Sequence, residues 1–175
     1  MPNSKLRSEE NNKTANYDDK QKILNDIRRV NRVLVKKGIV AIPVRYSDHR
    51  VLIYVYRPSF LEKDFCDRDT AILLSELGYE VSDVTSCVRC LSRKLINLAS
   101  SKDFPHEIGL FLGYPPEDVD GFINRKDECK FCGHWKVYGD VESAKCCFAR
   151  YRKCTDLYYR QWQKGKDIER LTIAV

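Results

Sequence analysis

The 175-residue sequence lacks the long apolar segments of membrane-spanning and secreted proteins. No uninterrupted hydrophobic run approaches the roughly 20 residues that a transmembrane helix requires. Residues 1–20 are polar, carry both signs of charge and lack the apolar centre of a secretory signal. Hydrophobic residues make up 43% of the chain and charged residues 32%, a balance that suits a globular protein with its own core. We therefore expect a cytoplasmic protein with no membrane partner.

The sequence also lacks the short motifs that assign a protein to a class of enzymes. It contains no HExxH, GxSxG, P-loop or GxGxxG pattern, and only three histidines. One of these, His106, precedes Glu107, and the two side chains could act as a general acid–base pair. The alternative is that Glu107 lies in the first turn of a helix, where the helix dipole favours a carboxylate. We assign no catalytic residue from the sequence.

A strong charge imbalance is missing as well. The net charge is +6 and the sequence pI is about 8.8, which permits an anionic partner without requiring one. The length suits one domain. Residues 1–19 contain few apolar side chains and are expected to form a disordered arm. The remaining residues, 20–175, are expected to form a single α/β-type domain.

The pattern of apolar residues predicts a helix, a β-hairpin and then further helices. Helical spacing begins at Ile23 and ends before Gly38, a residue suited to closing a helix. The hairpin strands are expected at 39–46, where Pro43 favours an edge position, and at 51–56. Later helices are expected at 60–77, 83–99, 106–112, 116–124 and 140–163, a short strand at 135–138 and a final strand at 171–175. This order indicates the α+β class, with a small, mainly antiparallel sheet packed by several helices and a long C-terminal helix.

Residues 106–124 fit the spacing of a helix-turn-helix. Gly109 would allow close approach of two helices, Gly113 would allow the turn, and Val119 would fill the angle between them. The second helix, however, begins with Glu117 and Asp118, and carboxylates there would repel DNA phosphates. Two helices packed at a sharp angle explain the pattern better than DNA binding does.

Eight cysteines are many for a chain of this length. Two CxxC pairs could together hold a tetrahedral metal, zinc or iron, through Cys87, Cys90, Cys129 and Cys132. The gap between the pairs is longer than the roughly 15–20 residues of common zinc sites. The alternative is that most of the cysteines are small buried apolar residues.

The expected C-terminal helix combines basic and aromatic residues. Side chains of this kind bind single-stranded nucleic acids. Four of the aromatic residues nevertheless share one helical stripe with Ala144, which predicts a buried face instead: Ala144, Phe148, Tyr151, Tyr158 and Trp162. On this interpretation the cations form the solvated face, and nucleic acid is the less favoured partner.

Three motifs carry a resemblance to a known family. The segments PHEIGLFLGYPPEDVDGF (105–122), CGHWKVYGD (132–140) and FARYRKCT (148–155) resemble an uncharacterised bacterial family of unknown function, typical of clostridia and related anaerobes. The strand VLIYVYRP and the helix ending in ELGY are similar to its N-terminal half. The family has a tyrosine where His134 stands, which counts against an essential role for that histidine. The resemblance implies a small α/β-type fold and no assigned activity.

The dense motifs around HEIGLFLGYP and WKVYGD suggest one shared binding site. If the two motifs converge, its candidate residues are His106, Glu107, Tyr114, Trp135, Lys136 and Tyr138. The alternative is that these residues only interlock a helix and a strand.

We therefore predict an uncharacterised cytosolic bacterial protein, a binding or accessory protein with a pocket for a small ligand or a metal. The first alternative is an enzyme that uses His106 and Glu107, or a cysteine, in the same pocket. The second alternative is a helix-turn-helix protein that binds nucleic acid.

Overall fold

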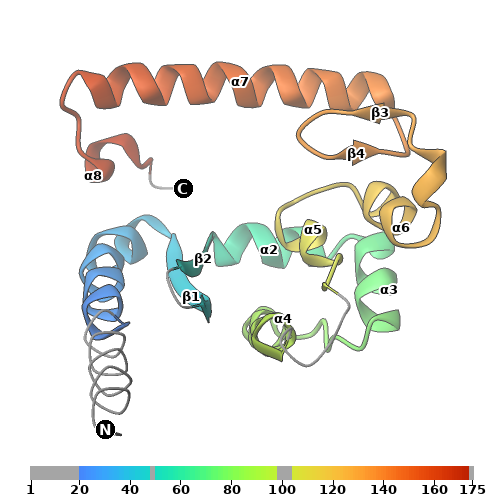
Figure 1. The fold of residues 1–175 in the computed structure, drawn as a ribbon, viewed down its shortest axis with the longest axis horizontal. Helices are drawn as coiled ribbons and strands as arrows, with labels where there is room; N and C mark the ends of the chain where they lie inside the picture. The colour runs from blue at the N-terminus through green and yellow to red at the C-terminus, as the bar shows by residue number, and fades with distance from the viewer. Residues whose placement is uncertain (1–19, 48–49, 98–103, 174–175) are drawn as a thin grey trace, which may run out of the picture.

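The computed structural model describes residues 20–47, 50–97 and 104–173. Figure 1 shows a helical protein in which a β-hairpin lies near one end and a long C-terminal helix runs along one edge. The fold is α+β, as the sequence predicts. The expected arm, residues 1–19, lies outside the described residues.

The N-terminal helix and the hairpin form as expected. Residues 20–34 are helical, a short 3-10 turn follows, and Gly38 ends the segment with a left-handed φ of 73°. Strands β1 (Val40–Ser47) and β2 (Arg50–Tyr56) pair in antiparallel register, with an irregularity between Pro43 and Arg45. A proline cannot donate to a strand neighbour, which is consistent with a break in register beside it.

The helix expected at 60–77 was a wrong prediction, because the structure divides it into two. Helix α2 covers Pro58–Phe65 and helix α3 covers Arg68–Glu76. Between them, the Asp67 carboxylate accepts hydrogen bonds from the backbone N–H and the hydroxyl of Thr70, both at 3.0 Å. An aspartate in this position caps a new helix, which explains why the chain turns here.

Helix α4 (Val84–Ile96) begins at Asp83, whose carboxylate accepts from the backbone N–H groups of Thr85 and Ser86. The last residues of the expected helix, 98–99, lie outside the described part of the chain. The main core lies between α4, the hairpin, α2, α3 and α5. Its fully buried side chains include Val44, Leu74, Leu91, Leu95 and Leu110.

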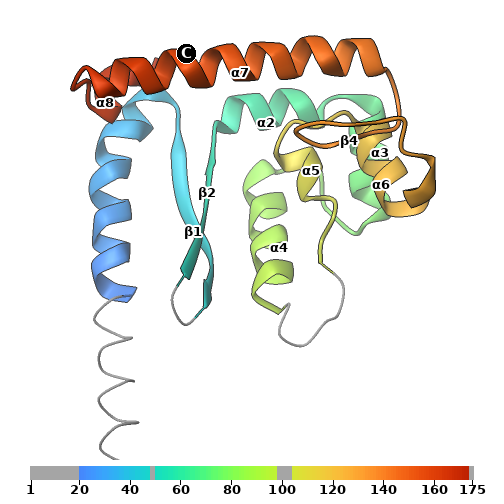
Figure 2. The same cartoon turned by 45° about the horizontal axis from the view of Figure 1, so that its top comes forward.

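The second half of the chain builds a smaller core on short elements. Helices α5 (Ile108–Phe111) and α6 (Pro116–Asn124) precede a 3-10 turn (Lys126–Glu128) and a small hairpin of β3 (Phe131–Cys132) and β4 (Lys136–Val137). Helix α7 (Val141–Gln163) starts at Asp140, as expected, and packs Ala144 and Phe148 against Trp135 and Val137. Figure 2 shows α7 crossing above α2 and the small hairpin.

The final strand expected at 171–175 is wrong for the described residues. Helix α8 covers Ile168–Leu171, and the chain then passes the hairpin without joining it as a strand. Two basic side chains from the first half of the chain bind the backbone of this C-terminal segment. Arg57 donates a hydrogen bond to the carbonyl of Ile173 at 2.6 Å, and Lys37 donates one to the carbonyl of Thr172 at 2.7 Å.

The buried aromatic stripe expected on α7 is also wrong beyond Phe148. Ala144 and Phe148 are buried, but Tyr151, Tyr158 and Trp162 are exposed. The reason is geometric, because the small core ends at Phe148 while the helix continues for four more turns past it.

None of the helices in the described part of the chain combines the length and the apolar character needed to cross a bilayer.

Candidate functional site

The site is positioned by a sharp turn between α5 and α6. Gly113 makes this turn with a φ of 73°, which few residues other than glycine adopt. Gly109 lets the two helices approach, since an added Cβ would lie 2.8 Å from a methyl group of Val119. Gly109 and Val119 therefore pack as the helix-turn-helix spacing predicts. The first helix, however, is only four residues long.

A buried carboxylate fixes the small hairpin onto α6. Both oxygens of Asp118 are occupied: Oδ2 accepts from the indole N–H of Trp135 at 2.7 Å, and Oδ1 accepts from the backbone N–H groups of Tyr138 and Gly139 at 2.7 and 2.8 Å. Asp118 is only 3% exposed. Glu117 and Asp118 do lie in the first turn of α6, as expected, and Asp118 has this additional role. The hairpin thereby covers the start of the helix that would face DNA in a helix-turn-helix.

Two glycines allow close packing around the small hairpin, one against Tyr138 and one against Phe148. An added Cβ at Gly121 would lie 2.3 Å from the ring of Tyr138, and one at Gly133 would lie 2.1 Å from the ring of Phe148. Only glycine fits at these two positions without moving an aromatic ring. Tyr138 is buried beneath α6, and its hydroxyl donates to the carbonyl of Lys126 at 3.3 Å.

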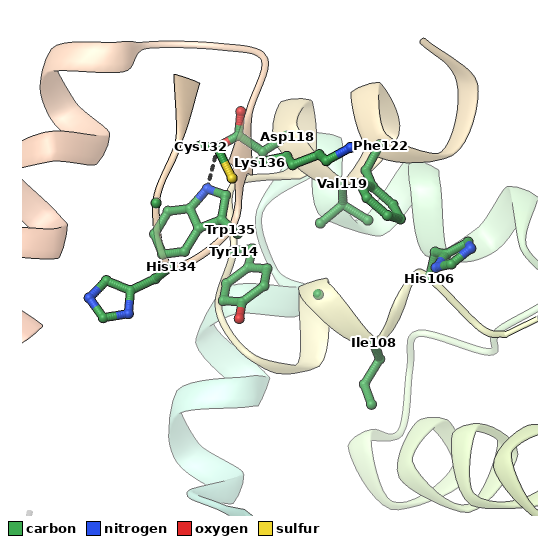
Figure 3. A pocket seen from close by; sticks show the side chains of 12 residues that line it. His106, Ile108, Tyr114, Asp118, Val119, Phe122, Cys132, His134, Trp135 and Lys136 are labelled. Atoms are coloured by element: carbon green, nitrogen blue, oxygen red, sulfur yellow. Dashed lines mark hydrogen bonds between the residues drawn. The ribbon is translucent and has the colours of Figure 1, made fainter. Parts of the chain in front are cut away.

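Between these elements lies a largely apolar pocket of about 350 Å³. One wall is the pair of Tyr114 and Trp135, whose rings stack with centroids 4.6 Å apart at an interplanar angle of 24°. The other wall is Phe122, which meets the ring of His106 edge-on at 4.9 Å. Figure 3 shows Val119 and Ile108 between the two walls. The remaining lining residues include Cys132, Gly133 and His134 at the hairpin.

One cationic group borders the pocket. The ammonium nitrogen of Lys136 lies 5.6 Å from the ring centroid of Phe122, and no ion pair holds it among the described residues. His106 lies on the same side in Figure 3, and its partly exposed imidazole can donate a hydrogen bond. His134, in contrast, extends away from them toward Phe148 and Tyr151.

The structure brings four of the six candidate ligand-binding residues to this pocket. They are His106, Tyr114, Trp135 and Lys136. Sequence reasoning missed the roles of Asp118 and Phe122 there. Their spacing of four residues, which places them on one face of a helix, was the available signal.

Glu107 lies outside the pocket, in a buried ion pair. Its Oε1 accepts from Lys94 Nζ at 2.7 Å and from the hydroxyl of Tyr79 at 2.9 Å. Lys94 also donates to the carbonyl of Leu77 and lies over the ring of Tyr79. Burial raises the pKa of Tyr79, and the nearby Glu107 carboxylate raises it further. The structure thus separates the proposed acid–base pair of His106 and Glu107, since each contacts different partners. Tyr138, the sixth candidate, also lies outside the pocket.

The four cysteines considered for a metal lie on different elements. Cys87 is buried in α4, where its thiol donates to the carbonyl of Glu80 at 3.1 Å and burial raises its pKa to about 11. Cys90 follows on the same helix. Cys129 donates to the carbonyl of Phe131 at 3.2 Å, and Cys132 lies at the pocket. In the described part of the chain, no three His, Cys, Asp or Glu residues are grouped so that they could hold a metal ion.

Neither the curated proteins nor the solved structures contain a match to this chain. A family model does match, over residues 5–172, and its description is Protein of unknown function (DUF3793). Since the match spans nearly the whole sequence, the chain belongs to the DUF3793 family of proteins of unknown function.

Proposed function

We propose that this is a binding protein whose pocket between α5, α6 and the β3–β4 hairpin holds a small, planar, aromatic molecule with an acidic group. The observation that carries the proposal is the combination of aromatic walls with a cation at one edge, Lys136, which has no ion-pair partner among the described residues. The volume of about 350 Å³ lies within the range of small-molecule sites.

The aromatic walls favour a flat ligand. Tyr114 and Trp135 present stacked rings, and Trp135 cannot turn freely because Asp118 holds its indole N–H. A rigid aromatic surface gives contact area with little loss of side-chain freedom on binding. A planar ring system is the shape that such a surface fits best.

The polar groups favour an acid. Asp118 presents little acceptor capacity to a ligand, because its two oxygens already accept three hydrogen bonds from Trp135 and the hairpin backbone. Lys136 and His106 therefore present mainly donors to a ligand. A carboxylate or similar anion would pair with the exposed Lys136 ammonium at the edge of the pocket.

We also propose that the protein acts in the cytoplasm of an anaerobic bacterium. Its eight cysteines are all free, which supports a reducing compartment. The motif resemblance supports the bacterial source.

Matched acid and amide pairs would test the ligand class. The probes are indole-3-acetate with indole-3-acetamide, and nicotinate with nicotinamide, titrated by ligand-observed NMR. We expect each acid to bind about tenfold more tightly than its amide. A Lys136→Met variant should remove that difference, whereas Lys126→Met, which removes an exposed cation outside the pocket, should retain it. Equal binding of acids and amides, or no binding of any probe, would contradict the proposal.

A further inference from the structure

The outer part of α7 carries aromatic side chains that are largely exposed in the described chain. Every residue from 149 to 160 is exposed. Tyr151 is 42% exposed, Tyr158 43% and Trp162 64%, which leaves much of their aromatic surface open to solvent. These three residues follow one another at spacings of seven and four, so they lie along one side of the helix, about 16 Å from first to last at 1.5 Å per residue. Figures 1 and 2 both show α7 running along one edge of the molecule.

Residues 145–166, which include this part of α7 and the three residues after it, hold the whole net positive charge of the protein. Residues 145–166 contain seven lysines and arginines but a single acid, Asp156, so their net charge is +6. The whole chain also has a net charge of +6, which means that its remaining residues are balanced. Of the seven cations, only Lys145 forms an ion pair among the described residues, with Glu142 at 2.8 Å. A protein whose net positive charge is concentrated on one segment is suited to an anionic partner at that segment.

The cations and the rings are neighbours on this surface. Arg152 and Tyr159 are seven residues apart and so share one side of the helix, and the ring centroid of Tyr159 lies 6.2 Å from that of Trp162. Beneath this part of α7, a groove of about 520 Å³ runs to the main hairpin; Tyr151 lines it together with Val55, Arg57 and Phe60. The guanidinium of Arg57 lies 5.7 Å from the ring centroid of Phe60. A partner following α7 would therefore meet aromatic rings and positive charge together.

We propose that α7 binds single-stranded nucleic acid. Bases stack on Tyr151, Tyr158 and Trp162, and the phosphates pair with the lysines and arginines of residues 145–166. Stacking on aromatic rings requires bases that are free of a duplex, so a single strand fits this surface and a duplex does not. The sequence favoured a buried stripe here, and the exposure of the rings removes the reason for that preference.

Other occupants fit the charge and chemistry less well. A second copy of the chain would bring two faces of charge +6 together. A bilayer surface favours helices with a broad aliphatic face, but the exposed apolar residues of α7 are mostly tyrosines, with Leu157 as an aliphatic exception.

Fluorescence anisotropy with labelled 20-mers of oligo(dT) and oligo(U), and with a 20-base-pair duplex, would test the proposal. The full chain should bind one or both single strands at 50 mM salt, at least tenfold more tightly than the duplex. The two single-strand arms distinguish DNA from RNA. The affinity should fall steeply as the salt concentration rises, because bound cations displace counterions from the phosphates. Trp162 fluorescence should be quenched on binding.

Two variants and one control make the outcome specific to α7. Tyr158→Ala with Trp162→Ala should weaken binding at least tenfold and leave most of the salt dependence. Arg152→Gln, Lys153→Gln and Arg160→Gln together should weaken binding and lower the slope of log K against log salt by about 2, at roughly 0.7 per phosphate contact. The matched control removes three exposed cations from the N-terminal helix (Arg28→Gln, Arg29→Gln and Arg32→Gln) and should change the affinity less than threefold.

Several results would overturn the proposal. They are no binding to either strand at 50 mM salt, an equal loss in the control, duplex binding as tight as single-strand binding, and no effect of the aromatic variant. Circular dichroism should show unchanged helix content in each variant, since the replaced side chains are exposed. Lys136→Met should leave oligonucleotide affinity unchanged, so this test succeeds or fails independently of the pocket proposal.

Discussion

The indole N–H of Trp135 donates a 2.7 Å hydrogen bond to the Asp118 carboxylate, which links the tip of a two-strand hairpin to the first turn of α6. Two backbone N–H groups of the same hairpin share the other carboxylate oxygen. One buried side chain thus fixes both the hairpin and the orientation of the ring that lines the pocket. The stability predictions for Asp118 and Gly121 depend on this arrangement.

Replacing Asp118 by asparagine should destabilise the protein by about 2–4 kcal/mol. The amide would retain one acceptor oxygen, but its NH₂ group would face a donor, either the Trp135 indole or the hairpin backbone. A buried donor left without a partner costs about 1–3 kcal/mol, and hydrogen bonds to a charged group are worth more than neutral ones. Urea unfolding followed by circular dichroism would measure the change.

Asp120→Asn is the matched control, on the same helix. Asp120 pairs with Arg125 at 3.3 Å on a partly exposed surface, and such pairs are worth about 0–1 kcal/mol. If the two variants lost the same stability, the Asp118 carboxylate would not be the link that we describe.

Glu107→Gln should lower stability without changing ligand binding. The variant removes the charge that pairs with Lys94, while Gln can still accept from Tyr79. We expect a loss of about 1–3 kcal/mol, moderated because Lys94 is partly exposed and can regain water. Thermal unfolding and probe titration on the same sample would measure both quantities. If a folded Glu107→Gln protein no longer bound the probes, Glu107 would have to take part in ligand binding, contrary to the site described above.

Gly121→Ala should destabilise the protein by about 1–3 kcal/mol, although alanine is the better helix former. The new Cβ would lie 2.3 Å from the Tyr138 ring, and overpacking of this kind outweighs the propensity gain of about 1 kcal/mol. Ala149→Gly, on the exposed side of α7, measures the ordinary propensity effect and should cost about 1 kcal/mol. A stabilised Gly121→Ala protein would show that the hairpin is not packed onto α6 as described.

Thiol labelling should divide the cysteines by burial. Exposed cysteines should react with iodoacetamide in the native protein: Cys66, Cys132, Cys146 and Cys154. Cys87 should react only after unfolding, because it is buried and its pKa is raised to about 11, so little thiolate forms. Mass spectrometry of digested samples would locate the labels, and rapid labelling of native Cys87 would be the contrary result.

The raised pKa of Cys87 also predicts a pH effect on stability. Above about pH 8.5 an unfolded cysteine loses its proton, whereas the folded protein keeps it until about pH 11. The unfolded state then binds fewer protons, so the free energy of unfolding should fall as the pH rises through this window. Urea unfolding at pH 8 and pH 10 should show a smaller fall in Cys87→Ala than in the parent. An equal fall would remove Cys87 as the cause.

The sequence predicted most elements because their signals are local. Gly38 and Gly113 mark positions of positive φ, and Asp83 and Asp140 mark helix starts, so each boundary depends on a few neighbouring residues. The break at Asp67 was missed, although an aspartate that can cap the following helix is also a local signal. The apolar residues around it fit one long helix equally well.

The tertiary partners could not be predicted in this way. Glu107 and His106 are adjacent in sequence, yet one pairs with Lys94 and the other contacts Phe122. The direction in which each side chain points depends on α4 and α6, which are distant in sequence from one another and supply these partners. The periodicity of α7 likewise shows which side chains share a face, but the exposed fraction of Trp162 depends on where the core ends.

The most direct test of the binding site is Trp135 fluorescence. The chain has two tryptophans, and Trp162→Phe leaves Trp135 as the only one, stacked on Tyr114 at the pocket wall. Nicotinate and nicotinamide contain no indole and so do not add to the tryptophan signal. In titrations of this variant, both should quench the Trp135 fluorescence saturably, the acid at a lower concentration than the amide, and Lys136→Met should abolish the difference. A signal that stays unchanged, or that responds equally to both probes, would contradict a pocket for aromatic acids.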